Sequence, residues 1–99
     1  MCIRDSKDPL IVCDDAALEQ AVHAALTGCF INCGQNCLAS ERILVFERCY
    51  DAFATRVSEL TRALRQGDPL GSEIVDVAAI VSPHQLALIE ELVLSLIHI

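Results

Sequence analysis

The sequence predicts an α/β fold in which short buried strands alternate with amphipathic helices. Two short apolar runs, 10–13 and 43–46, have the length and composition of buried strands. Each run precedes a segment whose apolar residues recur every three or four positions, which is the pattern of a helix with one buried face. This order of strand, helix, strand and helix implies parallel strands joined by a right-handed crossover.

The first strand and helix are expected between residues 10 and 34. Leu10–Cys13 is a continuous apolar run, typical of a strand that is buried on both faces. Asp14 and Asp15 can cap a helix that begins near Ala16. Gly34 is its expected end, because glycine adopts the left-handed conformation at little cost. The apolar face of this helix comprises Leu18, Val22, Leu26, Cys29, Phe30 and Cys33.

A polar loop, Gln35–Ser40, leads into the second strand, Ile43–Phe46. The second helix follows, and Gly67-Asp68-Pro69 is expected to end it. Its apolar face comprises Tyr50, Phe53, Val57, Leu60 and Leu64.

The last third of the sequence predicts a loop and one more helix. Gly71–Val81 is interpreted as a loop with a short strand at Val77–Val81. Ser82-Pro83-His84-Gln85 resembles a capping box with proline in the first turn. A third helix is therefore expected from Pro83 to about Val93.

Composition and charge exclude several classes of function. Fourteen Asp and Glu oppose seven Lys and Arg, so no basic surface is expected for nucleic acid or an anionic membrane. No apolar run reaches the roughly 18–20 residues that cross a bilayer. A cytoplasmic protein is expected. The hydrophobic fraction is 54%, which calls for more burial than 99 residues provide, and two or three parallel strands leave open edges. We interpret the chain as part of a larger domain.

Six cysteines occupy positions 2, 13, 29, 33, 37 and 49. A disulfide framework is one interpretation, but Cys13 lies in an apolar run and Cys29 on an apolar helix face, where free cysteine acts as a small hydrophobe. The spacing of Cys29, Cys33 and Cys37 leaves open a non-enzymatic thiol or metal-binding module. We favour it less, because the spacing is not that of zinc knuckles and no fourth ligand is evident.

The segment around Cys37 resembles the active-site signature of the aldehyde dehydrogenase superfamily. That signature is a phenylalanine, Gly-Gln, a cysteine two residues after the glutamine, and an arginine five residues further on. The corresponding residues are Phe30-Ile31-Asn32-Cys33-Gly34-Gln35-Asn36-Cys37, with Ala39 and Arg42. Lys7-Asp8-Pro9-Leu10-Ile11-Val12 is similar to the segment after the family's Glu-Leu-Gly-Gly motif, and Arg42–Pro69 is similar to the segment after its nucleophile.

This resemblance implies part of a three-layer α/β/α catalytic domain over residues 7–93. It implies an oxidoreductase that converts an aldehyde to a carboxylic acid, with Cys37 as the nucleophile that forms a thiohemiacetal and then a thioester. NAD or NADP is the implied cofactor, whose binding segment is expected outside this chain, and no metal is implied. The full-length enzyme is expected to be a homodimer or a homotetramer.

The sequence also departs from the family pattern. The general-base glutamate of the family aligns with Ile3, and the local Asn32 and Asn36 do not correspond to its oxyanion-binding asparagine. Residues 1–6 and 94–99 are interpreted as doubtful, non-native termini. Arg42 is expected to hold the loop through backbone carbonyls or a carboxylate. Among the cysteines after residue 6, Cys37 is expected to be the most accessible, and Cys13 and Cys29 the least.

Overall fold

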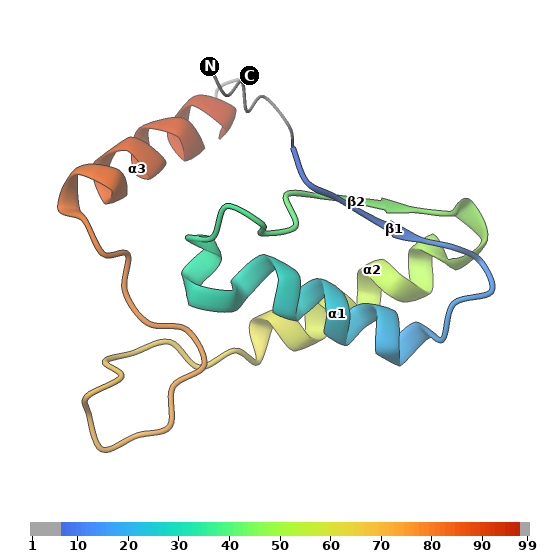
Figure 1. Cartoon of the computed structure of the whole chain (residues 1–99), viewed down its shortest axis with the longest axis horizontal. Coiled ribbons are helices and arrows are strands. Elements are labelled where there is room, and N and C mark those ends of the chain that lie inside the picture. Colours follow the sequence, from blue (N-terminus) through green and yellow to red (C-terminus); the bar gives the residue numbers. More distant parts are fainter. Residues whose placement is uncertain (1–6, 98–99) are drawn as a thin grey trace.

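The computed structural model describes residues 7–97 (Figure 1). Residues 1–6 and 98–99 lie outside the described residues. The predicted correspondence of Ile3 to the family's general-base glutamate therefore also lies outside them. The elements are β1 (Pro9–Val12), α1 (Leu18–Phe30), the short 3₁₀ turn η1 (Ile31–Gly34), β2 (Arg42–Val45), α2 (Glu47–Arg62) and α3 (Pro83–Ile97).

The two strands pair in parallel, which confirms the α/β class and the strand–helix–strand order. Leu10 lies opposite Ile43, and Val12 lies opposite Val45. Both α1 and α2 contact the same face of this pair, as Figure 1 shows. The buried core between them consists of Val12, Val22, Ala25 and Phe53.

The other face of the strand pair is exposed. Ile11 keeps 60% of its surface accessible and Leu44 keeps 52%. The prediction of strands buried on both faces is therefore wrong within residues 7–97, because every described element that packs on the sheet lies on one side. Cys13 was expected within the first strand, but β1 ends at Val12 and Cys13 is exposed.

Helix α1 begins later than the two aspartates suggest. Its N-cap is Ala17, with an extended backbone and no capping side-chain bond. The N–H of Ala16 donates to the carbonyl of Cys13 at 3.1 Å, so Asp14 and Asp15 are used in the turn that leads into the helix. The predicted capping by these residues is wrong, and Asp14 instead pairs with Arg48 at 3.2 Å.

Helix α1 ends earlier than the periodicity of its apolar residues suggests. The α-helix ends at Phe30, and Gly34 adopts the predicted left-handed conformation with φ of 72°. Asn32 and Cys33 are also left-handed, with φ of 51° and 59°. Asparagine tolerates this region because its short amide bonds nearby backbone, here from Asn32 Nδ2 to the carbonyl of Gln35 at 3.2 Å. Among residues 7–97 the side chain of the half-buried Cys33 makes no such bond, so its left-handed backbone is strained.

Helix α2 stops before the expected Gly-Asp-Pro sequence, and the backbone just after it bonds to a distant side chain. The helix ends at Arg62. Three residues later the backbone N–H of Arg65 donates to the carboxylate of Asp76 at 3.0 Å, instead of continuing the helical series. The guanidinium of Arg65 binds both oxygens of the same carboxylate at 2.8 and 2.7 Å. This double attachment closes the loop between the two residues.

The predicted strand at Val77–Val81 is absent from the described residues, where Val77 forms only an isolated parallel bridge with Gln66. Helix α3 begins at Pro83 as predicted, but it continues to Ile97 because residues 94–97 contain no helix breaker. Ser82 contributes its carbonyl, which accepts from the N–H of Leu86 at 3.0 Å, and no side-chain capping bond of Ser82 forms among the described residues.

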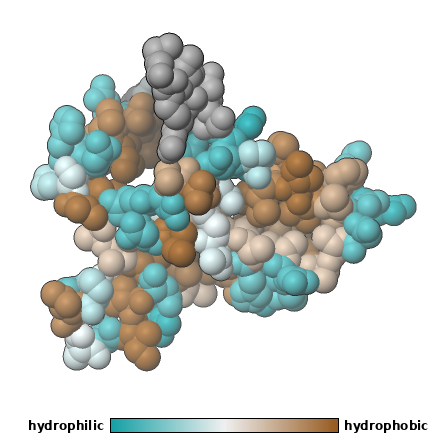
Figure 2. Space-filling model, in the orientation of Figure 1, coloured by the Kyte–Doolittle hydropathy of each residue, from teal (hydrophilic) through white to brown (hydrophobic). Residues whose placement is uncertain are grey.

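Helix α3 packs little against the rest of the described chain. It contains no buried residue, and its large apolar side chains are 39–70% exposed, as for Ile89 and Leu96. Figure 2 shows hydrophobic residues at several places on the surface of the molecule. Over residues 7–97, no helix has both the length and the hydrophobicity needed to cross a bilayer.

Candidate functional site

Cys37 lies in a tight turn between η1 and β2. The N–H of Ala39 donates to the carbonyl of Asn36 at 3.0 Å, which closes the turn around Cys37 and Leu38. The Oδ1 atom of Asn36 accepts from the N–H of Leu38 at 3.0 Å and fixes the same turn from its side chain. Cys37 is exposed, so its sulfur is accessible to a small molecule.

The end of the turn is attached to helix α1. Ala39 is buried, and the N–H of Ser40 donates to the carbonyl of Gly28 at 2.9 Å. The thiol of Cys29 donates to the carbonyl of Ser40 at 3.2 Å. A Cβ atom on Gly28 would lie 2.6 Å from Ser40 Oγ, so glycine allows this close approach. These contacts fix the backbone just after Cys37.

The start of the turn is held by the side chain of Gln35. Its Nε2 atom donates to the carbonyl of Asn32 at 3.1 Å and to that of Ala79 at 3.5 Å. Its Oε1 atom accepts from the N–H of Val81 at 2.9 Å. The sequence motif includes Gln35, but no sequence signal identified residues 79 and 81 as its partners.

Arg42, the arginine of the motif, holds the backbone, as predicted. Its Nε and Nη2 atoms donate to the carbonyl of Lys7 at 3.1 and 2.9 Å. The ammonium of Lys7 pairs with Glu41 at 2.9 Å. Arg42, the first residue of β2, therefore joins the start of this strand to the residue two positions before β1.

The other cysteines correct part of the accessibility prediction. Cys13 is exposed, like Cys37, so its predicted burial is wrong. Cys29 is half-buried, as are Cys33 and Cys49, and burial raises the pKa of the Cys29 thiol. Within residues 7–97, no three His, Cys, Asp or Glu side chains lie where they could hold a metal ion together. The alternative of a metal-binding module using Cys29, Cys33 and Cys37 gains no support.

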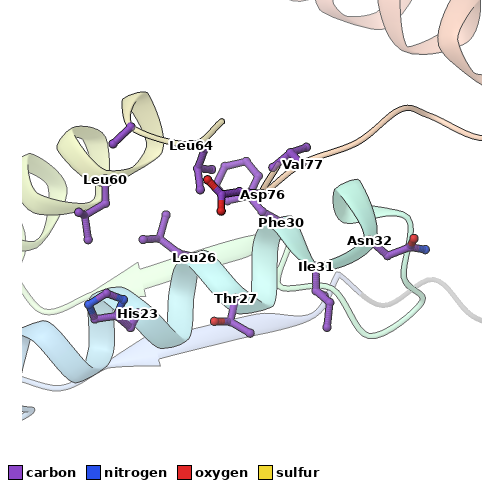
Figure 3. A pocket seen from close by; sticks show the side chains of 11 residues that line it. His23, Leu26, Thr27, Phe30, Ile31, Asn32, Leu60, Leu64, Asp76 and Val77 are labelled. Carbon is purple, nitrogen blue, oxygen red and sulfur yellow. The ribbon is translucent and has the colours of Figure 1, made fainter. Parts of the chain in front are cut away.

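A groove of about 520 Å³ separates the C-terminal halves of α1 and α2 (Figure 3). Leu26 and Leu60 project into it from the two helices, and Asp76 and Val77 lie at its edge. His23, to which the sequence assigned no role, also lines it. Cys37 is not among the lining residues, so this groove and the Cys37 turn are separate features.

Comparison with known proteins identifies relatives of the chain. The sequence model of the aldehyde dehydrogenase family matches residues 4–98. A betaine aldehyde dehydrogenase of Cereibacter sphaeroides is 45% identical over 80 residues, which are 81% of this chain and 16% of that protein. A vanillin dehydrogenase of Pseudomonas fluorescens is 45% identical over 69 residues, which are 70% of this chain and 14% of that protein.

Solved structures agree in fold. A 3,6-anhydro-L-galactose dehydrogenase superposes with a TM-score of 0.82 at 42% identity, over 88% of this chain and 18% of that one. Lactaldehyde dehydrogenase of Escherichia coli superposes with a TM-score of 0.81 at 35% identity, over 86% of this chain and 18% of that one. The chain thus spans less than a fifth of the length of these relatives.

Proposed function

The chain belongs to the aldehyde dehydrogenase family, and we propose that Cys37 is the nucleophile of an enzyme that oxidises an aldehyde to a carboxylic acid. The observation that carries the proposal is the geometry of the turn. An exposed thiol lies at the apex of a turn whose two ends are fixed by Gln35 and by Ser40. Catalytic side chains concentrate on loops that a rigid scaffold positions in this way.

The proposed reaction begins when the thiolate of Cys37 forms a bond to the aldehyde carbonyl carbon, which gives a thiohemiacetal. Within residues 7–97 the backbone N–H of Cys37 donates to no acceptor, so it can stabilise the developing oxyanion. Asn32 and Asn36 both bond to the backbone of their own loop. The thioester would form when the oxyanion re-forms the carbonyl and the C–H bond breaks, with the hydride passing to an acceptor outside the described residues. Water would then hydrolyse the thioester, releasing the acid and restoring the thiol.

NAD or NADP is the hydride acceptor that we propose for the whole protein. Relatives support it, since the 3,6-anhydro-L-galactose dehydrogenase structure contains NAP and a Bacillus cereus aldehyde dehydrogenase structure contains NAD⁺. The described residues do not fit a dinucleotide. The connection from β1 to α1 carries Asp14 and Asp15 and has no glycine, so it would repel a pyrophosphate. We therefore assign no cofactor-binding residue within 7–97.

We expect residues 7–93 to act as part of a catalytic domain, and the isolated chain to show no sustained turnover. Positioning of the reactants can supply roughly 7–11 kcal/mol of barrier lowering. General-base help contributes roughly a hundred- to ten-thousandfold more. Neither a cofactor site nor a general base is assigned among the described residues. Purified chain incubated with NAD or NADP and several aldehydes should produce no steady rise in absorbance from reduced nicotinamide.

A chimera tests the proposal directly. Residues 7–93 would replace the matching segment of the Cereibacter sphaeroides betaine aldehyde dehydrogenase, and the rate of nicotinamide reduction would be measured with betaine aldehyde. We expect activity that Cys37→Ala abolishes and that Cys33→Ala retains. A second graft, with the matching segment of the Pseudomonas fluorescens vanillin dehydrogenase, shows whether the host accepts a foreign segment. If that graft is active while ours is folded and inactive, the proposal is wrong.

A further inference from the structure

We infer that Gln35 is a positioning residue, whose side-chain amide fixes the Cys37 turn against residues 79–81. The position of the thiol and the position of the segment that leads into α3 are then set together. The functional meaning of this attachment rests on the proposed role of Cys37. The attachment itself does not, because it follows from the hydrogen bonds of Gln35.

Both polar atoms of the Gln35 side-chain amide make hydrogen bonds. Nε2 donates to the carbonyls of Asn32 and Ala79, and Oε1 accepts from the N–H of Val81. The carbonyl of Asn32 also accepts from the backbone N–H of Gln35 at 3.1 Å, so side chain and backbone support the same turn. A carboxylate at this position would keep the acceptor and lose the donors, and a thioether would lose both.

The attachment is the last one along the chain before α3. The segment after α2 is held first by the Arg65–Asp76 pair and then by the bridge between Gln66 and Val77. Among the described residues, the side-chain bonds that reach residues 78–82 from elsewhere in the chain come from Gln35. Helix α3 contributes no buried residue, so its packing could not replace these hydrogen bonds in holding residues 78–82. Without Gln35, residues 79–81 would separate from the Cys37 turn.

The position of the Cys37 thiol affects the rate of the proposed reaction, because a nucleophile must lie close to its target atom. A displacement of about 1 Å at the reacting atoms can cost on the order of a hundredfold in rate. The start of the Cys37 turn follows three consecutive left-handed residues, which are costly to hold without support. Gln35 supplies that support through its bonds to Ala79 and Val81, which lie 44 and 46 positions further along the sequence.

The first experiment uses the full 99-residue chain and needs no enzymatic activity. Gln35→Met removes the bonds while keeping a side chain of similar length, and Gln35→Glu keeps the acceptor for Val81. Gln20→Met is the matched control, because Gln20 is exposed on α1 and makes no side-chain hydrogen bond among the described residues. Amide hydrogen exchange at Val81, the rate of Cys37 alkylation by iodoacetamide and far-ultraviolet circular dichroism would be measured for each variant.

We expect Gln35→Met to accelerate exchange at Val81 about tenfold, the effect of losing hydrogen bonds of ordinary strength. It should also change the alkylation rate of Cys37 at unchanged helix content. Gln35→Glu should retain most of the protection at Val81, and Gln20→Met should match the unsubstituted chain. The inference is overturned if Val81 exchanges equally fast in all variants. It is also overturned if Val81 loses protection while Cys37 reacts at an unchanged rate.

The second experiment repeats Gln35→Met and Gln35→Glu in the active chimera. A positioning role predicts a decrease in kcat of about tenfold or more with a smaller change in KM, and partial recovery with Gln35→Glu. An unchanged kcat would contradict the inference. A chimera that is inactive even with Gln35 present would count against the proposed function alone, because the exchange and alkylation measurements do not depend on turnover.

Discussion

Residues 9–62 and residues 63–97 differ in how they are held. The first region contains the parallel strand pair, α1 and α2, and all members of its core cluster lie within it. The second contains a loop closed by the Arg65–Asp76 pair and helix α3, which buries no residue. Apolar composition does not separate the two regions, because α3 consists largely of Leu, Ile and Val. Burial requires a facing surface, and in the described chain only the first region has one.

The largest expected effect distinguishes these regions directly. Phe53→Ala should lower the free energy of unfolding by about 3–5 kcal/mol, because it leaves a cavity in the core. Leu92→Ala should change it by no more than about 0.5 kcal/mol, since Leu92 is 56% exposed. Urea denaturation followed by circular dichroism measures both. Equal effects would show that α3 is packed as firmly as the core.

A smaller effect is expected at the turn before Cys37. Gly34→Ala should cost about 1–2 kcal/mol, because φ at this position is 72°. Gly71→Ala is the matched control, as a Cβ atom there meets a carbonyl at 3.2 Å, close to the 3.1 Å at Gly34, with no left-handed φ. Its effect should stay within about 0.5 kcal/mol. If both substitutions cost the same in urea denaturation, crowding and not φ determines the cost.

Thiol labelling tests the exposure pattern across the first region. Cys13 and Cys37 should be alkylated first in a brief iodoacetamide treatment, since both are exposed. Cys29 should be among the last, because it is half-buried and its thiol pKa is raised. Peptide mass spectrometry at several reaction times gives the order. Labelling of Cys29 ahead of Cys37 would contradict the proposed accessibility of the nucleophile.

The smallest effect concerns the loop of the second region. The hydrogen bonds from Arg65 lower the pKa of Asp76 from its ordinary 3.8 to about 2. A lowered pKa means that the carboxylate stabilises the folded loop above pH about 4, and that this contribution is lost as the pH falls from about 4 to 2. Amide exchange at Val77, compared between pH 5 and pH 2.5 after correction for intrinsic rates, should show the loop opening. Asp76→Asn should remove this pH dependence, and its persistence would point to another group.

Local patterns predicted which strands and helices the first region contains and the motif around Cys37, but not all of the bounds of those elements. The periodicity of Leu18, Val22 and Leu26 predicts α1, and the apolar run before it predicts β1. Gly34 was correctly expected in the left-handed conformation. The family resemblance, confirmed by the match over residues 4–98, rested on the residues of the signature around Cys37, on their spacing and on the similar flanking segments.

Features that depend on distant partners could not be predicted. The attachment of the segment just after α2 depends on Asp76, which lies eleven positions after Arg65. The bonds of Gln35 join it to residues 79 and 81, and nothing in the local sequence marks those partners. The predicted burial of Cys13 failed for a related reason. An apolar run indicates that a strand can be buried, but it does not say which neighbours are present.

Parallel pairing also decides at which edge of the sheet the proposed chemistry takes place. Both strands run in the same direction, and the Cys37 turn precedes β2, so the thiol lies at the amino-terminal edge of the strand pair. The carbonyl of Asp8, just before β1, accepts from the N–H groups of Glu41 and Arg42 and joins the two chain segments there. Open α/β sheets usually bind ligands at the opposite, carboxyl-terminal edge. The Cys13–Ala17 connection at that edge can therefore change in length without moving the nucleophile, whereas one residue inserted at 40–41 would displace it from β2.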